Sequence, residues 1–135
     1  MLTRTAGYAL HAVLTIAEMG ADGRAVRANE VADALSIPGN YLSKILQTLA
    51  RAGVLVSERG RNGGFRLAAD PADIRLLAVV DPFDDLGRER QCLLGRGTCT
   101  DVGGCPAHAE WREASAPAFR FFESHTIASL LLSRR

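Results

Sequence analysis

Residues 54–67 read VLVSERGRNGGFRL, two short apolar segments on either side of a glycine-rich stretch. The β-branched and apolar residues of the two segments favour strands, and Asn62-Gly63 between them is a favoured hairpin turn. Arg59 and Arg61 flank this turn, and its glycines allow the backbone to approach a ligand closely. The stretch therefore predicts a β-hairpin with a basic tip.

The segment before this hairpin predicts a helix from about Pro38 to Ala52. The fixed φ of Pro38 suits a first helical position, and Gly53 suits the end of a helix. Its apolar residues share one face, namely Leu42, Ile45, Leu46 and Leu49. Hydrogen-bonding side chains share the opposite face, namely Asn40, Ser43, Lys44, Gln47 and Arg51. We expect the first face to pack and the second face to contact a partner.

Two further helices are expected upstream of Pro38. Residues 3–20 carry apolar side chains around most of a helical circumference, so this helix is expected to be largely buried. A shorter helix is expected over residues 29–35, with Asn29 as its N-cap. The order helix, helix, turn, helix, hairpin predicts a winged helix-turn-helix domain over residues 1–80, which is mainly α with a small β-hairpin. In such a domain the second helix of the motif enters the major groove of DNA, and the hairpin is the wing.

The distribution of charge agrees with a DNA-binding face. The formal net charge is only +1, but residues 36–66 hold five basic side chains and a single acid, Glu58. DNA affinity arises chiefly from the neutralisation of phosphates. The residues expected to contact DNA are Asn40, Tyr41, Ser43, Lys44 and Gln47 on the helix, and Arg59, Arg61 and Asn62 on the wing. The alternative, that these side chains only solvate an outer surface, is less favoured because they coincide with the elements that use them.

Length and composition limit the other function classes. The chain has 135 residues, of which 47% are hydrophobic, and this suits one compact domain with an extension. No stretch approaches the roughly 20 apolar residues of a membrane span, so we expect a soluble, cytoplasmic protein that contacts no membrane. The sequence has no Cys-x-x-Cys motif, no paired acid and base, and no phosphate-binding glycine loop, so we do not expect an enzyme.

The segment after the hairpin predicts a helix and a linker. A helical stretch is expected over residues 70–80, and Asp81-Pro82 then breaks or bends it because proline removes a backbone donor. Residues 81–106 follow, and their part from 87 to 106 is rich in glycine, arginine and cysteine with little periodicity. We expect them to form a linker and a cysteine-rich, cluster-binding loop without a core of its own.

Residues 107–135 are expected to form a dimerisation helix and a C-terminal tail. Apolar side chains recur there at intervals of three and four residues, at Trp111, Ala114, Ala118, Phe121 and Phe122. This spacing predicts a long amphipathic helix with a kink at Pro117. Thr126 is expected to cap a short last helix from Ile127. An exposed apolar stripe needs a partner, so we expect a homodimer.

The three cysteines of the chain carry its most unusual chemistry. Cys92, Cys99 and Cys105 are spaced Cys-x6-Cys-x5-Cys, and His108 follows three residues after the last one. The glycines between them let a loop fold around a centre and direct backbone N–H groups at sulfur, as iron–sulfur sites require. Zinc is the less favoured metal because the close Cys-x2-Cys pairs of structural zinc sites are absent. His11 on the first helix is a substitute for His108 as fourth ligand.

Over essentially its full length the chain resembles the IscR and NsrR family of bacterial winged-helix regulators. The resemblance is carried by Tyr8-Ala9-Leu10, by residues 37–42 before Ile45-Leu46, by residues 59–64, by the three cysteines and by Trp111. It implies a homodimer joined through the long C-terminal helix. It also implies that each loop holds an iron–sulfur cluster whose state changes the affinity for a pseudo-palindromic DNA operator.

Residue by residue, the resemblance assigns a ligand set. The three cysteines match the family's cysteine ligands, and His108 matches the histidine that completes the 2Fe-2S site of IscR. A 2Fe-2S cluster is thus favoured over a 4Fe-4S cluster, since Gly7 stands where NsrR-like members carry a ligating carboxylate. Two features depart from IscR, because the first cysteine gap is one residue longer and the wing is closer to that of NsrR. The alternative function is a cluster-free or zinc-binding regulator that responds to a partner protein, a small molecule or thiol oxidation.

Overall fold

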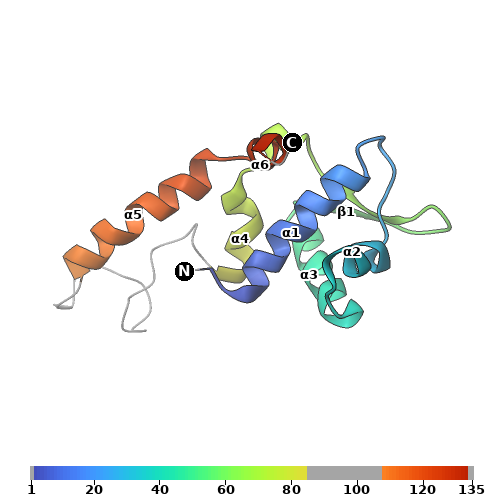
Figure 1. Ribbon diagram of the computed structural model, residues 1–135, viewed down its shortest axis with the longest axis horizontal. Coiled ribbons are helices and arrows are strands. Elements are labelled where there is room, and N and C mark those ends of the chain that lie inside the picture. The colour runs from blue at the N-terminus through green and yellow to red at the C-terminus, as the bar shows by residue number, and fades with distance from the viewer. Residues whose placement is uncertain (1, 85–107, 134–135) are drawn as a thin grey trace.

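The computed structural model describes residues 2–84 and 108–133 of the chain. The elements are α1 (Arg4–Met19), α2 (Ala28–Leu35), α3 (Gly39–Arg51), β1 (Leu55–Glu58), β2 (Gly64–Leu67), the 3-10 turn η1 (Pro71–Asp73), α4 (Leu76–Asp84), α5 (His108–Ser124) and α6 (Ile127–Ser133). The described chain is mainly helical with one antiparallel hairpin, which confirms the predicted fold class. The hairpin and α5 extend to opposite ends of the long axis (Figure 1).

Helix α1 is the centre of the core, as its apolar pattern predicts. It contacts α2, α3, α4, α6 and β2. Its buried side chains include Val13 and Ile16, which join a single hydrophobic cluster with residues from every neighbouring helix. Thr3 is the N-cap of the helix, and its side chain accepts a hydrogen bond from the Ala6 N–H at 3.1 Å. Such capping satisfies a donor that the first helical turn leaves without a partner.

The helix-turn-helix unit starts differently from the prediction. The N-cap of α2 is Arg27 and not Asn29, because the Glu30 carboxylate accepts the Arg27 N–H at 2.8 Å and closes the first turn. A carboxylate three residues into a helix is well placed for this bond. Pro38 is likewise the N-cap of α3, and Gly39 is its first helical residue. The N-cap of α2 thus lies two residues earlier than predicted and α3 starts one residue later, while the element order is the predicted one.

The hairpin has a longer loop than Asn62-Gly63 alone predicts. Register runs from Leu55 opposite Leu67 to Glu58 opposite Gly64, so residues 59–63 form the loop. The Gly63 N–H donates to the Gly60 carbonyl at 3.0 Å, which places residues 61 and 62 at the centre of the turn. Positive φ angles occur at Gly60 and Gly64. The prediction of a two-residue turn at Asn62-Gly63 is therefore wrong, because the positions that need glycine's freedom are 60 and 64.

The segment after the wing is divided more finely than predicted. Asp70 caps η1 by accepting the Ala72 N–H at 2.9 Å, and Ile74 is extended, so residues 70–80 are not one helix. Pro82 lies inside α4, which continues to Asp84. Pro82 therefore does not end the helix, and the last turn of α4 extends into residues expected to belong to the linker.

The chain returns to the core after α5. Ile127 is fully buried, and Leu130 and Leu131 pack on the core, so α6 lies against α1 and η1. Backbone hydrogen bonds join residue 76 to residue 125 and residue 127 to residue 74, both at 2.9 Å. Thr126 caps α6 as predicted, since its hydroxyl accepts the Ser129 N–H at 3.3 Å. Residues 127–133, grouped by the sequence with a C-terminal tail, thus pack with the winged-helix part.

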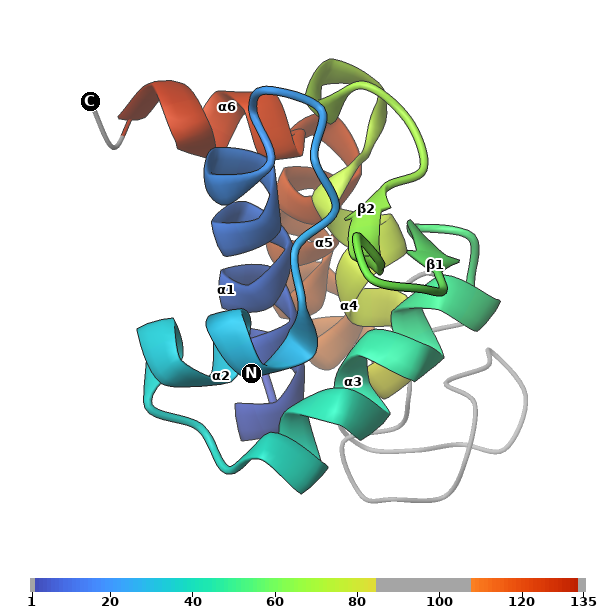
Figure 2. The same ribbon diagram turned by 90° about the vertical axis from the view of Figure 1, so that its right-hand side faces the viewer.

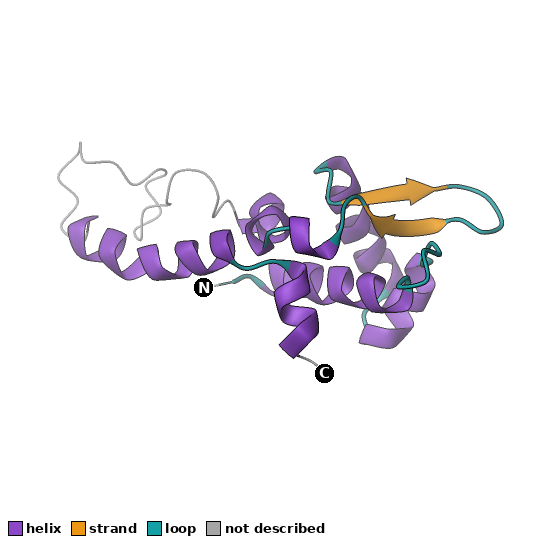
Figure 3. Cartoon of the chain, turned by 90° about the horizontal axis from the view of Figure 1, so that it is seen from above, coloured by secondary structure: helices purple, strands orange, loops and turns teal. Residues whose placement is uncertain are grey.

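Helix α5 leaves the body of the protein and continues through Pro117 (Figures 1 and 3). None of its described side chains is fully buried, although it contacts α4. Within the described ranges, no helix combines the length and the apolar character needed to cross a membrane.

Candidate nucleic-acid interface

Helix α3 presents the two faces that its sequence predicts. Leu42, Ile45, Leu46 and Leu49 are buried against the rest of the domain. Asn40, Lys44 and Gln47 are exposed on the opposite side, and Ser43 is half-buried between the two faces. These polar side chains recur about once per helical turn, and the apolar face of the helix already packs on the rest of the domain. They are therefore available to contact a DNA groove that the helix enters.

Tyr41 lies at the start of α3 and has contacts that the sequence did not reveal. Its hydroxyl is hydrogen-bonded to the hydroxyl of Thr5 on α1. Its ring meets that of Tyr8 edge to face, with 5.9 Å between centroids. The side chain is still 36% exposed. Tyr41 therefore attaches the N-terminal end of α3 to α1 while it keeps an edge at the surface.

The polar and charged side chains of the wing loop are exposed to solvent. Arg59, Arg61 and Asn62 are exposed. The base of the wing is held by Val26, whose N–H and C=O bond the C=O and N–H of Phe65 at 2.9 and 2.7 Å. This pairing adds a single residue to the edge of the two-stranded sheet, and it could not be inferred from local sequence patterns.

Two more arginines lie beside the wing, and sequence reasoning missed both. The Arg27 guanidinium donates to the carbonyl of Arg61 at the centre of the wing turn. Arg24 forms an ion pair with Glu30 at 3.3 Å, and Arg66 on β2 forms an ion pair with Glu58. The signal in the sequence was the pair of arginines at positions 24 and 27, just before the helix-turn-helix.

Helices α2 and α3 and the hairpin lie together on one side of the molecule, in front of α5 (Figure 2). Helix α3 and the hairpin carry exposed cations, which are Lys44 and Arg51 on α3 and Arg59 and Arg61 on the wing. A helix with exposed hydrogen-bonding groups beside a basic loop can enter a groove and neutralise the flanking phosphates.

The expected metal ligands are only partly described. Cys92, Cys99 and Cys105 lie outside the described residues. His108 is the first residue of α5, and His11 is exposed on α1. Among residues 2–84 and 108–133, no three His, Cys, Asp or Glu side chains lie close enough to hold a metal ion.

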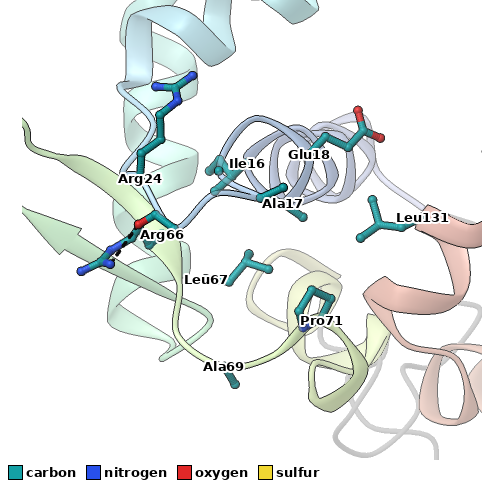
Figure 4. A pocket seen from close by; sticks show the side chains of 12 residues that line it. Ile16, Ala17, Glu18, Arg24, Arg66, Leu67, Ala69, Pro71 and Leu131 are labelled. Atoms are coloured by element: carbon teal, nitrogen blue, oxygen red, sulfur yellow. Dashed lines mark hydrogen bonds between the residues drawn. The ribbon is translucent and has the colours of Figure 1, made fainter.

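A hollow of about 780 Å³ lies between the end of α1, strand β2 and α6 (Figure 4). Ile16, Leu67 and Leu131 supply apolar walls, and Arg24 and Arg66 lie at one side. No residue expected from the sequence to contact DNA or metal lines this hollow. It borders the candidate interface through the arginines beside the wing, since Arg24 also lines the cavity at the base of the wing.

Comparison with known proteins identifies the family. Residues 2–132 match the Rrf2 family, described as an iron-dependent transcriptional regulator. This chain belongs to the Rrf2 family. The match confirms the resemblance to IscR-type and NsrR-type regulators, and it makes this Rrf2 protein a transcriptional regulator and not an enzyme.

Individual relatives agree with this membership. The regulator NsrR of Geobacillus kaustophilus is 32% identical over 134 residues, which are 98% of this chain and 90% of NsrR. The structure of T. potens IscR has a TM-score of 0.79 at 19% identity, covering 100% of this chain and 88% of that one. CymR, described as the global cysteine regulator of B. subtilis, has a TM-score of 0.76 at 17% identity, covering 98% and 97%. The two structures establish that the Rrf2 protein has their fold.

Proposed function

We propose that this Rrf2 protein is a cytoplasmic, homodimeric regulator that binds DNA sequence-specifically. Its affinity for an operator is set by an iron–sulfur cluster. One observation carries the DNA-binding part. Helix α3, whose polar side chains are exposed, and the hairpin that carries the basic loop lie on the same side of the domain (Figure 2). This is the arrangement that a major-groove helix and a flanking backbone contact require.

Helix α3 supplies the sequence readout in this proposal. Asn40, Ser43, Lys44 and Gln47 reach the base edges of the major groove, and Tyr41 contacts the adjoining backbone. Amide and hydroxyl groups can donate and accept hydrogen bonds, and lysine can donate to guanine. Arg59, Arg61 and Asn62 of the wing contact the minor groove or the phosphates beside it.

Dimerisation is assigned to α5. Trp111, Phe119 and Phe122 are half-buried and Phe121 is 44% exposed. Among the described elements, α5 packs mainly on α4. A second copy of α5 would cover these rings. A two-fold dimer then places two α3 helices about one DNA turn, roughly 34 Å, apart on a pseudo-palindromic operator.

The donor set suits an iron–sulfur cluster. Cys92, Cys99 and Cys105 supply three thiolates and His108 an imidazole, with His11 as the substitute ligand. Thiolate with imidazole is an established ligand set for 2Fe-2S centres, which favours 2Fe-2S over 4Fe-4S, and zinc is the less favoured occupant. When bound, the cluster supplies a change of oxidation state. The Asp84 carboxylate accepts the Thr3 N–H at 3.0 Å, so the last residue described before the cysteine segment lies beside the start of α1.

The DNA-binding proposal is tested by selection from a random duplex library. Purified dimer should enrich a pseudo-palindrome with half-sites one helical turn apart, and Lys44→Gln should remove most of the enrichment. Arg120→Gln, an exposed arginine on α5, is the matched control and should select the same sequence. A library that shows no enrichment after several rounds would contradict DNA recognition by this chain.

The cofactor is tested separately by anaerobic purification. We expect a coloured protein with near-equal iron and sulfide, and Cys99→Ala should remove both colour and iron. Stoichiometric zinc without sulfide would overturn the cluster and support the second candidate, a zinc-binding or thiol-responsive regulator. The observation that favours this candidate is that the fold is shared with a protein described as a global cysteine regulator.

A further inference from the structure

The junction between the wing and the start of α2 is a second basic feature beside the recognition helix. It is built by the Val26–Phe65 backbone pairing, with N···O distances of 2.9 and 2.7 Å. This pairing places residue 27 directly beside the wing loop. The Arg27 side chain then donates to the Arg61 carbonyl, so the guanidinium of Arg27 lies against the central peptide of the wing turn.

Charge at this junction is unevenly balanced. Two ion pairs join Arg24 to Glu30 and Arg66 to Glu58. The Glu30 carboxyl has its pKa lowered below the ordinary value of 4.5, first by the Arg27 N–H and then by Arg24, so it remains ionised and paired at neutral pH. Arg27 and Arg61 take part in neither of these ion pairs. Their two positive charges are in excess of the described carboxylates at the junction.

The junction is also hollowed. A cavity of about 430 Å³ opens there, and its lining includes Arg24, Arg27 and Arg61 together with Glu30 and Glu58. One N–H of Arg27 is used on the Arg61 carbonyl, and a guanidinium carries five in a fixed fork. The remaining donors suit bidentate recognition of a phosphate.

We propose that this junction binds a phosphate group of the DNA backbone, with Arg27 as the contacting residue. Arg27 thereby has two roles, because the same guanidinium holds the wing turn through the Arg61 carbonyl. The inference rests on the proposed DNA-binding function and adds to it a contact outside α3 and the wing loop. A phosphate bound here lies between the wing and α2 and fixes the register of the domain on the duplex.

The test is the salt dependence of affinity for the selected operator, measured by fluorescence anisotropy. Arg27→Gln should weaken binding about tenfold and lower the slope of log K against log salt by about one, because one phosphate contact is lost. Arg27→Lys keeps the charge and should restore the slope, with affinity only partly recovered since the fork is lost. Arg75→Gln, an exposed arginine between η1 and α4, should change neither quantity.

The remaining outcomes separate the competing explanations. Weaker binding of Arg27→Gln with an unchanged slope would mean that Arg27 only positions the wing, and would overturn the phosphate contact. A second arm heats the protein without DNA in inorganic phosphate or in chloride of equal ionic strength. The site takes free phosphate, and the proposal is wrong, if three results occur together. Phosphate raises the Tm of the wild type, Arg27→Gln removes that rise, and the salt slope of DNA binding is the same in both proteins.

The failure of this inference is distinct from the failure of the proposed function. If Lys44→Gln lowers affinity while Arg27→Gln changes neither the affinity nor the slope, DNA binding through α3 stands and the Arg27 contact is wrong. If the wild-type dimer binds no duplex at any salt concentration, the proposed function and this inference are both wrong.

Discussion

At the residue scale, Tyr41 joins α3 to α1 through a hydroxyl bond to Thr5 and an edge-to-face contact with Tyr8. The sequence predicted Tyr41 only as a DNA-contacting residue of α3. The partner residues lie more than thirty positions earlier, and no local pattern connects them. The bond matters because it fixes the end of the helix that is proposed to enter the groove.

The Thr5–Tyr41 bond can be measured by a double-mutant cycle. Tyr41→Phe should lower the free energy of unfolding by about 1 kcal/mol, the usual net contribution of one hydrogen bond. Thr5→Val should cost a similar amount, and the double variant should cost clearly less than the sum because both changes remove one interaction. Urea denaturation gives these values, and strictly additive costs would show that the bond is not made.

Gly64 makes a second prediction at this scale. Its φ is +143°, and a Cβ there would lie 2.5 Å from the Val26 carbonyl oxygen. Gly64→Ala should therefore destabilise the fold by about 2 kcal/mol or more. Gly7→Ala is the matched control, because a Cβ at Gly7 meets nothing within 4 Å on α1, and it should be neutral or stabilise by about 1 kcal/mol. Equal unfolding midpoints for the two variants would contradict this account of the wing.

At the element scale, the sequence predicted what depends on neighbours in the chain. The faces of α3 follow from helical periodicity, and Leu42 and Leu46 are buried as expected while Lys44 and Gln47 are exposed. The wing turn was placed wrongly, because Gly64 owes its conformation to close approach by Val26. Long-range packing of this kind has no local signature.

The residues of the candidate site likewise comprise some that local sequence predicts and some that only long-range contacts reveal. The polar residues of α3 and the arginines of the wing loop were found from spacing and charge. Arg27 was missed because its significance comes from the Arg61 carbonyl, 34 residues later in the sequence. Return of α6 to the core was missed for the same reason, since Ile127 packs on helices far earlier in the chain.

The N-terminus of α2 should show a pH dependence of stability. Because the folded pKa of Glu30 is lowered, chiefly by the Arg27 N–H, its ionised form stabilises the fold above the ordinary pKa of 4.5. That contribution is lost as the pH falls through the lower folded pKa. Thermal unfolding should show Glu30→Gln less stable than wild type at pH 7 and no less stable at the acid limit. A difference between the two proteins that stays constant across this range would contradict the cap.

At the scale of the whole molecule, the wing and α5 point away from each other along the long axis (Figure 1). Helices α4 and α6 lie between them (Figure 1). Helix α4 contacts both α1 and α5, and α6 contacts α1. Within the described residues, these packed helices join the two ends. The proposed regulator uses this separation, with DNA at one end and the partner subunit at the other.

Oligomeric state tests the role of α5. Phe121 is exposed on α5 and its ring stacks on that of His125, with 4.1 Å between centroids. Phe121→Asp places a charge on the proposed dimer face and should convert the dimer to a folded monomer in sedimentation velocity. Val56→Asp is the matched control, because Val56 is 45% exposed on β1 and should leave the dimer intact. A Phe121→Asp protein that still sediments as a dimer would exclude α5 as the interface.

The most direct test of a cluster-controlled DNA-binding regulator is one anaerobic titration. The selected operator duplex is titrated with cluster-loaded protein and with the same protein after chelation and desalting, and affinity is followed by anisotropy. We expect the two affinities to differ by about tenfold or more, the usual size of coupling between two sites, and Cys99→Ala to bind like the chelated form. Equal affinities for the loaded and chelated proteins would contradict cluster control of DNA binding.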